Sequence, residues 1–262
     1  MKILVLSFYF LPDLCAGSFR CTALVEELKK YSDCEIEIIT TLPNRYASFS
    51  VDALQLEKEG NVTIHRVALP SHKSGMVDQI KAFSTYYREA QKIATSGNYD
   101  VVYATSSRLF TAFLGARFAN KKRLPLYLDI RDIFVDTIKD VLSPKLSLFA
   151  KPVFSLIEKY TFKRAQRINL VSKGFKQYFE DRYPHADYRW YTNGIDKEFL
   201  LAGVIEETPL KPPKVLQVLY AGNLGEGQGL HNIIPLLAKA LEGRVEFHII
   251  GDGGRKAQLE NA

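Results

Sequence analysis

The chain has few of the residues that build metal centres or disulfide frameworks. It contains three cysteines, Cys15, Cys21 and Cys34, which is an odd number without metal-ligand spacing. Its five histidines are scattered, and no two stand four residues apart. This pattern indicates a reducing cytoplasm and excludes a disulfide-stabilised secreted domain. We expect no bound metal, and Cys15, in a glycine-containing loop, is the cysteine worth testing as a reactive thiol.

Long apolar runs are also missing. No stretch approaches the roughly 18 apolar residues of a membrane span. Residues 2–14 hold one basic residue and no small-residue cleavage site, so they are typical of a buried first strand rather than of a signal peptide. The net charge of +6 comes without a nucleic-acid recognition motif. We therefore expect a soluble protein with no nucleic-acid partner.

What the sequence does contain is a regular alternation of short apolar runs and helical stretches. Strands separated by helical lengths form βαβ units, which predicts a Rossmann-like parallel sheet over residues 1–196. Residues 197–214 are rich in proline and charge and indicate a linker. Residues 215–262 read as strand, glycine turn, helix and strand. We predict an α/β protein with one whole domain and the first βαβ unit of a second, and we expect such a fragment to be inactive alone.

Three loops follow predicted strands, at the edge where open α/β sheets bind ligands. The first, residues 11–20, opens a helix and contains Gly17, at which a phosphate or sugar can approach the backbone and the helix N-terminus. A plain turn with Ser18 as helix cap is the alternative. The second and third loops contain the other candidate donor-binding residues, for which a tight turn is again the alternative: Gly222, Asn223, Gly225, Gln228, Gly229, Gly251, Asp252 and Gly253.

A charged tetrapeptide, Asp129-Ile130-Arg131-Asp132, ends the strand predicted over residues 125–132. Strand alternation places Asp129 and Arg131 on one face and Asp132 on the other. A carboxylate beside a guanidinium can orient hydroxyl groups or act as a base. These three residues are therefore candidate catalytic residues, and a structural salt bridge at the sheet edge is the competing interpretation.

Positive charge gathers in residues 138–167, which hold seven basic and two acidic residues. Within them, residues 142–164 place apolar side chains at helical spacing, and Pro152 is expected to kink or split that helix. A basic amphipathic helix can lie on a membrane surface, whereas the alternative is a stripe that packs on its own sheet. The candidate membrane-facing residues are Lys145, Lys151, Lys159 and Lys163.

Six segments in order along the chain resemble the family-four retaining glycosyltransferases of the GT-B fold, in the group that builds bacterial O-antigens and capsules. They are FYFLPDLCAGSFR, LYLDIRDIF, AQRINLVSKGF, YTNGID, YAGNLGEGQGL and FHIIGDGG. The resemblance implies two Rossmann-like domains, with the acceptor on the first and a nucleotide-diphosphate sugar mainly on the second. It also implies that Gly17 approaches the donor diphosphate and that Arg131 takes the place of a catalytic-site histidine.

The chain departs from that family pattern in the second-domain glycine loop. Asn223 and Gln228 stand where many relatives have an arginine and a lysine that hold the diphosphate. The resemblance predicts transfer, without a metal or other cofactor, to a lipid-linked saccharide at the inner face of the bacterial plasma membrane. Two other classes stay open. One is an epimerase or dehydrogenase, although residues 35–40 end in threonine rather than in the acidic residue of a nicotinamide site. The other is a non-catalytic membrane-docking module.

Overall fold

The chain forms two compact units, Met1–Gly194 and Ile195–Ala262. The computed structural model describes residues 1–44, 51–70, 76–106, 109–133, 144–195, 200 and 214–261. The predicted linker therefore lies almost wholly outside the described residues. None of the helices in the described part of the chain has an apolar stretch long enough to cross a bilayer.

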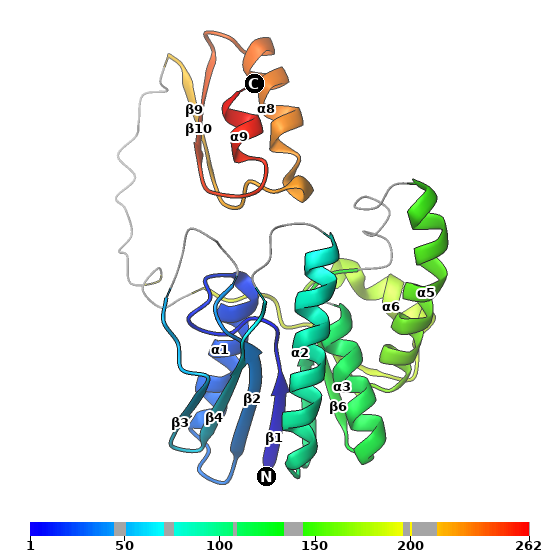
Figure 1. Cartoon of the computed structure of the whole chain (residues 1–262). Helices are drawn as coiled ribbons and strands as arrows, with labels where there is room; N and C mark the ends of the chain where they lie inside the picture. The colour runs from blue at the N-terminus through cyan, green and yellow to red at the C-terminus, as the bar shows by residue number, and fades with distance from the viewer. Residues whose placement is uncertain are drawn as a thin grey trace. The chain divides into compact units, whose positions relative to one another are not determined.

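An eight-stranded sheet is the centre of the first unit (Figure 1). Its order is β3-β4-β2-β1-β5-β6-β7-β8, and neighbouring strands pair in parallel except for β3 with β4. The strands are β1 (Lys2–Leu6), β2 (Glu35–Thr41), β3 (Leu56–Glu59), β4 (Val62–Val67), β5 (Val101–Thr105), β6 (Leu126–Ile130), β7 (Arg167–Leu170) and β8 (Asp187–Arg189).

Helices cover both faces of this sheet. Alternate side chains of β1 point to opposite faces and therefore pack against different helices. Leu4 and Leu6 belong to the core cluster that contains Tyr86 of the second helix, whereas Ile3 and Val5 pack in the cluster that contains Val25 of the first. Each fully buried leucine or isoleucine stabilises the fold by about 1.5–3 kcal/mol. The helices are α1 (Ala16–Lys29), α2 (Met76–Ser96), α3 (Leu109–Lys122), α5 (Pro144–Lys163) and α6 (Lys176–Arg182), with a short 3-10 turn η1 (Lys173–Phe175) before the last.

Several predicted boundaries differ from the structure. The strand β6 ends at Ile130, so Arg131 and Asp132 lie beyond it. The helix α5 continues through Pro152 as one element. The antiparallel strand β3 was not predicted, because its sequence LEKE has neither an apolar face nor a buried residue. The last strand, β8, has only the three residues Asp187–Arg189.

The second unit contains two parallel strands, β9 (Leu216–Ala221) and β10 (Val245–Ile250). Between and after them lie the 3-10 turn η2 (Glu226–Gln228) and the helices α8 (Leu230–Ala240) and α9 (Lys256–Glu260). The strand–turn–helix–strand order matches the pattern in the sequence. On the face of these two strands that points away from α8, Leu219 and Ile250 are exposed.

Candidate functional site

The strand order of the first unit diverges at β1, which pairs with β2 on one side and with β5 on the other. Such a switch point in an open parallel sheet leaves a crevice at the carboxyl ends of the strands, where ligands commonly bind. Three buried hydroxyl residues lie there. Ser7 Oγ donates to the Tyr9 carbonyl at 2.7 Å and lies 3.4 Å from Thr105 Oγ1, and Ser106 follows directly in the chain.

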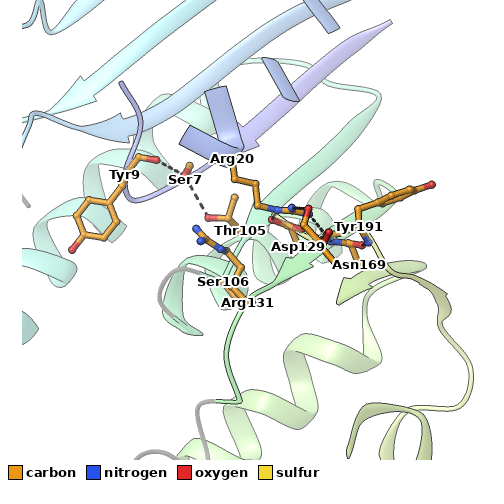
Figure 2. Close-up of polar contacts among 10 residues, drawn as sticks. Ser7, Tyr9, Arg20, Thr105, Ser106, Asp129, Arg131, Asn169 and Tyr191 are labelled. Atoms are coloured by element: carbon orange, nitrogen blue, oxygen red, sulfur yellow. Dashed lines mark hydrogen bonds and ion pairs between the residues drawn. The ribbon is translucent and has the colours of Figure 1, made fainter. Parts of the chain in front are cut away.

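Arg131 follows the end of β6 and lies beside this hydroxyl cluster (Figure 2), and Asp132 is the next residue in the chain. The Arg131 backbone N–H donates to Ser106 Oγ at 3.0 Å, which fixes the start of the segment. The buried Arg131 Nε has no hydrogen-bond partner among the residues that the structure describes. Partial burial raises the pKa of Asp132, and the positive charge of Arg131 opposes that rise. Because both residues lie past the strand, the predicted alternation of faces does not apply to them.

Asp129 pairs with Arg20 of α1 and not with Arg131 as the alternation argument implied (Figure 2). Arg20 Nε donates to Asp129 Oδ2 at 2.8 Å, and Nη2 donates to Oδ1 at 2.9 Å. The aspartate is only 1% exposed. Burial acts to lower the pKa of Arg20, but the hydrogen bond and charge of Asp129 outweigh it and raise that pKa. This is a fork-to-fork ion pair, the strongest arrangement of these two groups.

The same ion pair is joined to the segment that follows β8. Arg20 also donates to the carbonyls of Tyr191 at 2.8 Å and Thr192 at 2.7 Å. Asn169 of β7 donates to Asp129 Oδ1 at 2.7 Å and accepts from the Tyr191 backbone N–H at 2.7 Å. Four separate segments therefore meet at one buried carboxylate. This network also borders a largely apolar groove of about 470 Å³ on the α1 side of the sheet.

The first loop does not use the helix cap of the plain-turn alternative. The cap residue of α1 is Cys15, which makes no side-chain capping bond, and Gly17 is a buried residue of the first helical turn. Ser18, the cap in that alternative, is buried and its Oγ has no partner among the described residues. Contacts from neighbouring strands hold the loop, because Thr41 Oγ1 donates to the Phe8 carbonyl at 2.8 Å and Arg66 Nη2 donates to the Leu11 carbonyl at 3.1 Å.

The predicted donor-binding residues of the second unit gather at one edge, where the loops after β9 and β10 meet. The Gly222 N–H donates to the Ile250 carbonyl at 2.9 Å, and the Leu224 N–H donates to the Asp252 carbonyl at 2.8 Å. A Cβ atom at Gly251 would lie 1.9 Å from the Gly222 carbonyl oxygen, and one at Gly253, whose φ is +155°, would lie 2.6 Å from the Leu224 backbone. Close backbone packing therefore explains why glycine is needed at positions 251 and 253, which agrees with the tight-turn alternative.

The glycine loop itself is organised by its two amide side chains. Gln228 Oε1 accepts from the Gly225 N–H at 3.2 Å and from Asn223 Nδ2 at 2.9 Å. Gly229 has a left-handed backbone with φ of 63° and immediately precedes α8, whose free N–H groups begin at this point. In the described residues, no group of three His, Cys, Asp or Glu side chains is placed to hold a metal ion.

Comparison with known proteins decides the family. The family model for a glycosyl transferase 4-like domain matches residues 18–190. The chain belongs to the glycosyl transferase 4-like family. A 43-residue stretch is 46% identical to the putative colanic acid biosynthesis glycosyl transferase WcaI of Escherichia coli (strain K12), and it spans 16% of this chain and 11% of that relative.

Solved structures place this glycosyl transferase 4-like chain in the GT-B fold, as predicted. Anabaena HepE (Alr3699), solved in complex with UDP, has a TM-score of 0.58 at 16% identity over 100% of this chain and 64% of its own. The sucrose-phosphate synthase of Thermosynechococcus elongatus has a TM-score of 0.51 at 8% identity over 76% of this chain and 93% of its own. Identities this low show a shared fold.

The residues that complete the first-unit site were not predicted from the sequence. Arg20 lies in the FYFLPDLCAGSFR segment, three residues after Gly17, and this short spacing was the available signal. Asn169 lies in the AQRINLVSKGF segment and is the one buried polar residue of β7. Ser7 and Ser106 directly follow the buried strands β1 and β5, at the edge of the sheet where ligand-binding loops were predicted.

Proposed function

We propose that the chain takes part in transferring a sugar from a nucleotide-diphosphate sugar to a saccharide acceptor. The observation that carries the proposal is the match of the glycosyl transferase 4-like family over residues 18–190, the region that contains the switch-point crevice of the first unit. Ser7, Ser106, Arg131 and Asp132 provide hydroxyl, cationic and anionic groups at that crevice. Such groups suit a ligand with many hydroxyl groups and a developing negative charge.

Within this proposal the charged residues have different roles. Arg131 interacts with the acceptor or the leaving phosphate, since its Nε has no protein partner among the described residues. Asp132 orients an acceptor hydroxyl, and its raised pKa makes the carboxylate a better proton acceptor. Asp129 is a positioning residue, because Arg20 and Asn169 occupy both of its oxygens. Its contribution to the reaction is to hold the end of β6 and so to place Arg131.

The donor is proposed to bind the loops of the second unit, at Gly222, Gly225 and Gly229 and beside Gly251, Asp252 and Gly253. Backbone N–H groups at the start of a helix favour phosphate. Asn223 and Gln228 shape the loop through their mutual hydrogen bond rather than supply positive charge. HepE, a GT-B structure that aligns over this whole chain, was solved with UDP. That observation supports a uridine diphosphate sugar as the first donor to test.

The cellular role follows from the family resemblance and remains part of the proposal. Transfer proceeds with retention, and the donor diphosphate helps to take the acceptor proton. The acceptor is a lipid-linked saccharide at the inner face of a bacterial plasma membrane, in cell-surface polysaccharide synthesis of the O-antigen type. The 43-residue similarity to a putative colanic acid biosynthesis enzyme supports this setting. Neither a metal nor an organic cofactor is required.

Binding of sugar nucleotides to the 262-residue chain, measured by calorimetry, tests the donor assignment. A panel of UDP-, GDP- and dTDP-sugars should contain at least one that binds, and NAD should not bind. Because the 262-residue chain is expected to be inactive alone, turnover is assayed with and without lipid-linked saccharides in a longer version whose second unit is extended to a full Rossmann-like domain. Arg131→Ala should lower transfer at least about 100-fold, the lower range for a group at the reacting centre. The matched control is Arg167→Ala, which removes a half-exposed arginine of β7 that pairs with Asp187.

Three results would overturn the proposal. Binding of NAD in place of every sugar nucleotide would indicate a dehydrogenase. Conversion of the sugar nucleotide without any acceptor would indicate an epimerase. Equal activity of the Arg131 and Arg167 variants would show that the switch-point crevice does not take part in the transfer reaction.

A further inference from the structure

One outer surface of the first unit combines exposed apolar and basic side chains on α5. Val153, Leu156 and Tyr160 are 55%, 68% and 36% exposed. Their spacing of three and four residues places them on one stripe of the helix. Two exposed lysines, Lys159 and Lys163, border this stripe, whereas the exposed Lys151 lies on the opposite side of the helix at 3.6 residues per turn. We refer to Val153, Leu156, Tyr160, Lys159 and Lys163 as the α5 face.

The α5 face is distinct from the side of the helix that packs on the domain. Phe162 is buried in the main core with Phe179, and Phe154 packs against Phe110 of α3 at a ring distance of 5.6 Å. The stripe predicted from the sequence thus divides, because Phe154 and Ile157 turn partly inward while Val153 stays exposed. The side chains of Lys145 and Phe149 lie outside the described residues.

Negative charge is absent from the exposed side chains of α5 from Lys151 to Lys163. Glu158, the only acidic residue in that helix, is 4% exposed and accepts hydrogen bonds from the hydroxyls of Tyr178 at 3.0 Å and Tyr183 at 3.1 Å. The neighbouring helix α3 contains no acidic residue in its sequence. It joins the α5 face at Tyr160, whose hydroxyl accepts from Asn120 at 3.1 Å, and it adds the exposed Arg117 and Lys121.

We propose that the α5 face docks on an anionic lipid bilayer, with Leu156 and Val153 entering the interface and the lysines contacting lipid phosphates. The charge of the face decides the occupant. A second copy of the chain would bring the same lysines together, and like charges in close contact repel. An apolar stripe flanked by lysines is the pattern of a helix that lies in the plane of a membrane surface. The inference adds a surface to the proposed function but does not depend on catalysis.

Vesicle co-sedimentation of the 262-residue chain tests the docking without any sugar nucleotide. Binding is expected to vesicles of phosphatidylglycerol and phosphatidylcholine, and to fall steeply as salt rises from ~0.1 M to ~0.5 M. The double variant Lys159→Gln, Lys163→Gln should bind about 25-fold more weakly, because each lysine at an anionic surface contributes about fivefold. The control with the same change in charge replaces Lys30 and Lys58, near the β3 edge of the sheet, and should bind as the parent does.

The apolar side chains of the α5 face are tested with a second pair of variants, one on the face and one elsewhere. Leu156→Gln should weaken binding about tenfold, whereas Leu54→Gln, at a leucine that is 69% exposed elsewhere, should not. Thermal unfolding checks that each variant remains folded. The proposal is overturned by equal binding to pure phosphatidylcholine, by no binding to either vesicle, or by equal losses in the test and control variants. It is also overturned if Leu156→Gln dissolves a dimer in size-exclusion chromatography. Since no step involves donor or acceptor, failure of the proposed transfer reaction would leave these results intact.

Discussion

Removing Arg20 is the sharpest test of how the first unit is held together. In Arg20→Ala, Asn169 is the one hydrogen-bond donor that the Asp129 carboxylate keeps among the described residues, while Asp129 remains a buried charge. Breaking a buried ion pair from one side costs about 3–5 kcal/mol. The Thr192 carbonyl loses its Arg20 donor as well, and the Tyr191 carbonyl keeps only the bond from Asn169 Nδ2 at 3.2 Å, but both carbonyls lie at the exposed end of the network and can bond to water. We therefore expect a loss of about 4 kcal/mol in the free energy of unfolding.

The chain offers a convenient probe and a matched control for this measurement. Trp190 is the only tryptophan in the sequence and lies in the first unit, so its fluorescence during urea unfolding follows that unit. Arg167→Ala removes an arginine whose pairing with Asp187 is half-exposed, which should cost less than about 1 kcal/mol. Arg20→Lys should fall between the two, because lysine keeps the charge but cannot form the two-pronged contact.

A double variant makes the test robust if Arg20→Ala fails to fold. Replacing both Arg20 and Asp129 with leucine removes the uncompensated charge, so it should cost less than removing Arg20 alone. Similar unfolding free energies for Arg20→Ala and Arg167→Ala would refute the reasoning. They would mean that Asp129 reaches water once Arg20 is gone, and that the network is not the anchor described above.

Three further outcomes are expected. A disulfide reagent should modify Cys15 first in the folded chain, since Cys21 and Cys34 are buried and burial raises the pKa of Cys21 to about 12; equal rates at all three would contradict this. Gly251→Ala should unfold the second unit, because its Cβ would overlap the Gly222 carbonyl, whereas Gly227→Ala has open space; circular dichroism and limited proteolysis compare the two. Transfer activity, once a donor is found, should persist in EDTA, and a loss restored by a divalent cation would contradict metal independence.

The parallel sheet was predictable because its signal is local. The strands β1 and β5 are short apolar runs and β2 alternates polar and apolar residues, and each is followed or preceded by a stretch of helical length. The strand β3 was not predictable in this way. Its residues Glu57, Lys58 and Glu59 show no alternation of apolar and polar side chains. The strand forms through antiparallel backbone pairing with β4. Pairing with a neighbour, rather than burial of side chains, decides such an edge strand.

The candidate site was only partly predictable for a related reason. The sequence pattern placed Asp129 and Arg131 at the end of a strand. The prediction that the two side chains share a face required the strand to continue to Asp132, but β6 ends at Ile130. The true partner, Arg20, lies 109 residues away in the sequence, and no local pattern links the two. Loops after parallel strands could be assigned to one edge, because topology alone brings them together. The catalytic and donor-binding roles of these residues stay predictions.

The two edge strands of the large sheet are poor partners for a further strand. At one end β3 is four residues long, with Glu57 bound to Arg66 and Glu59 bound to Lys29. At the other end β8 has three residues, and its Asp187 pairs with both Arg167 and Arg189. Another chain that tried to pair there would gain few backbone hydrogen bonds and would have to strip water from ion pairs. Short, charged edges therefore protect this parallel sheet from edge-to-edge aggregation while the protein is concentrated or partly unfolded.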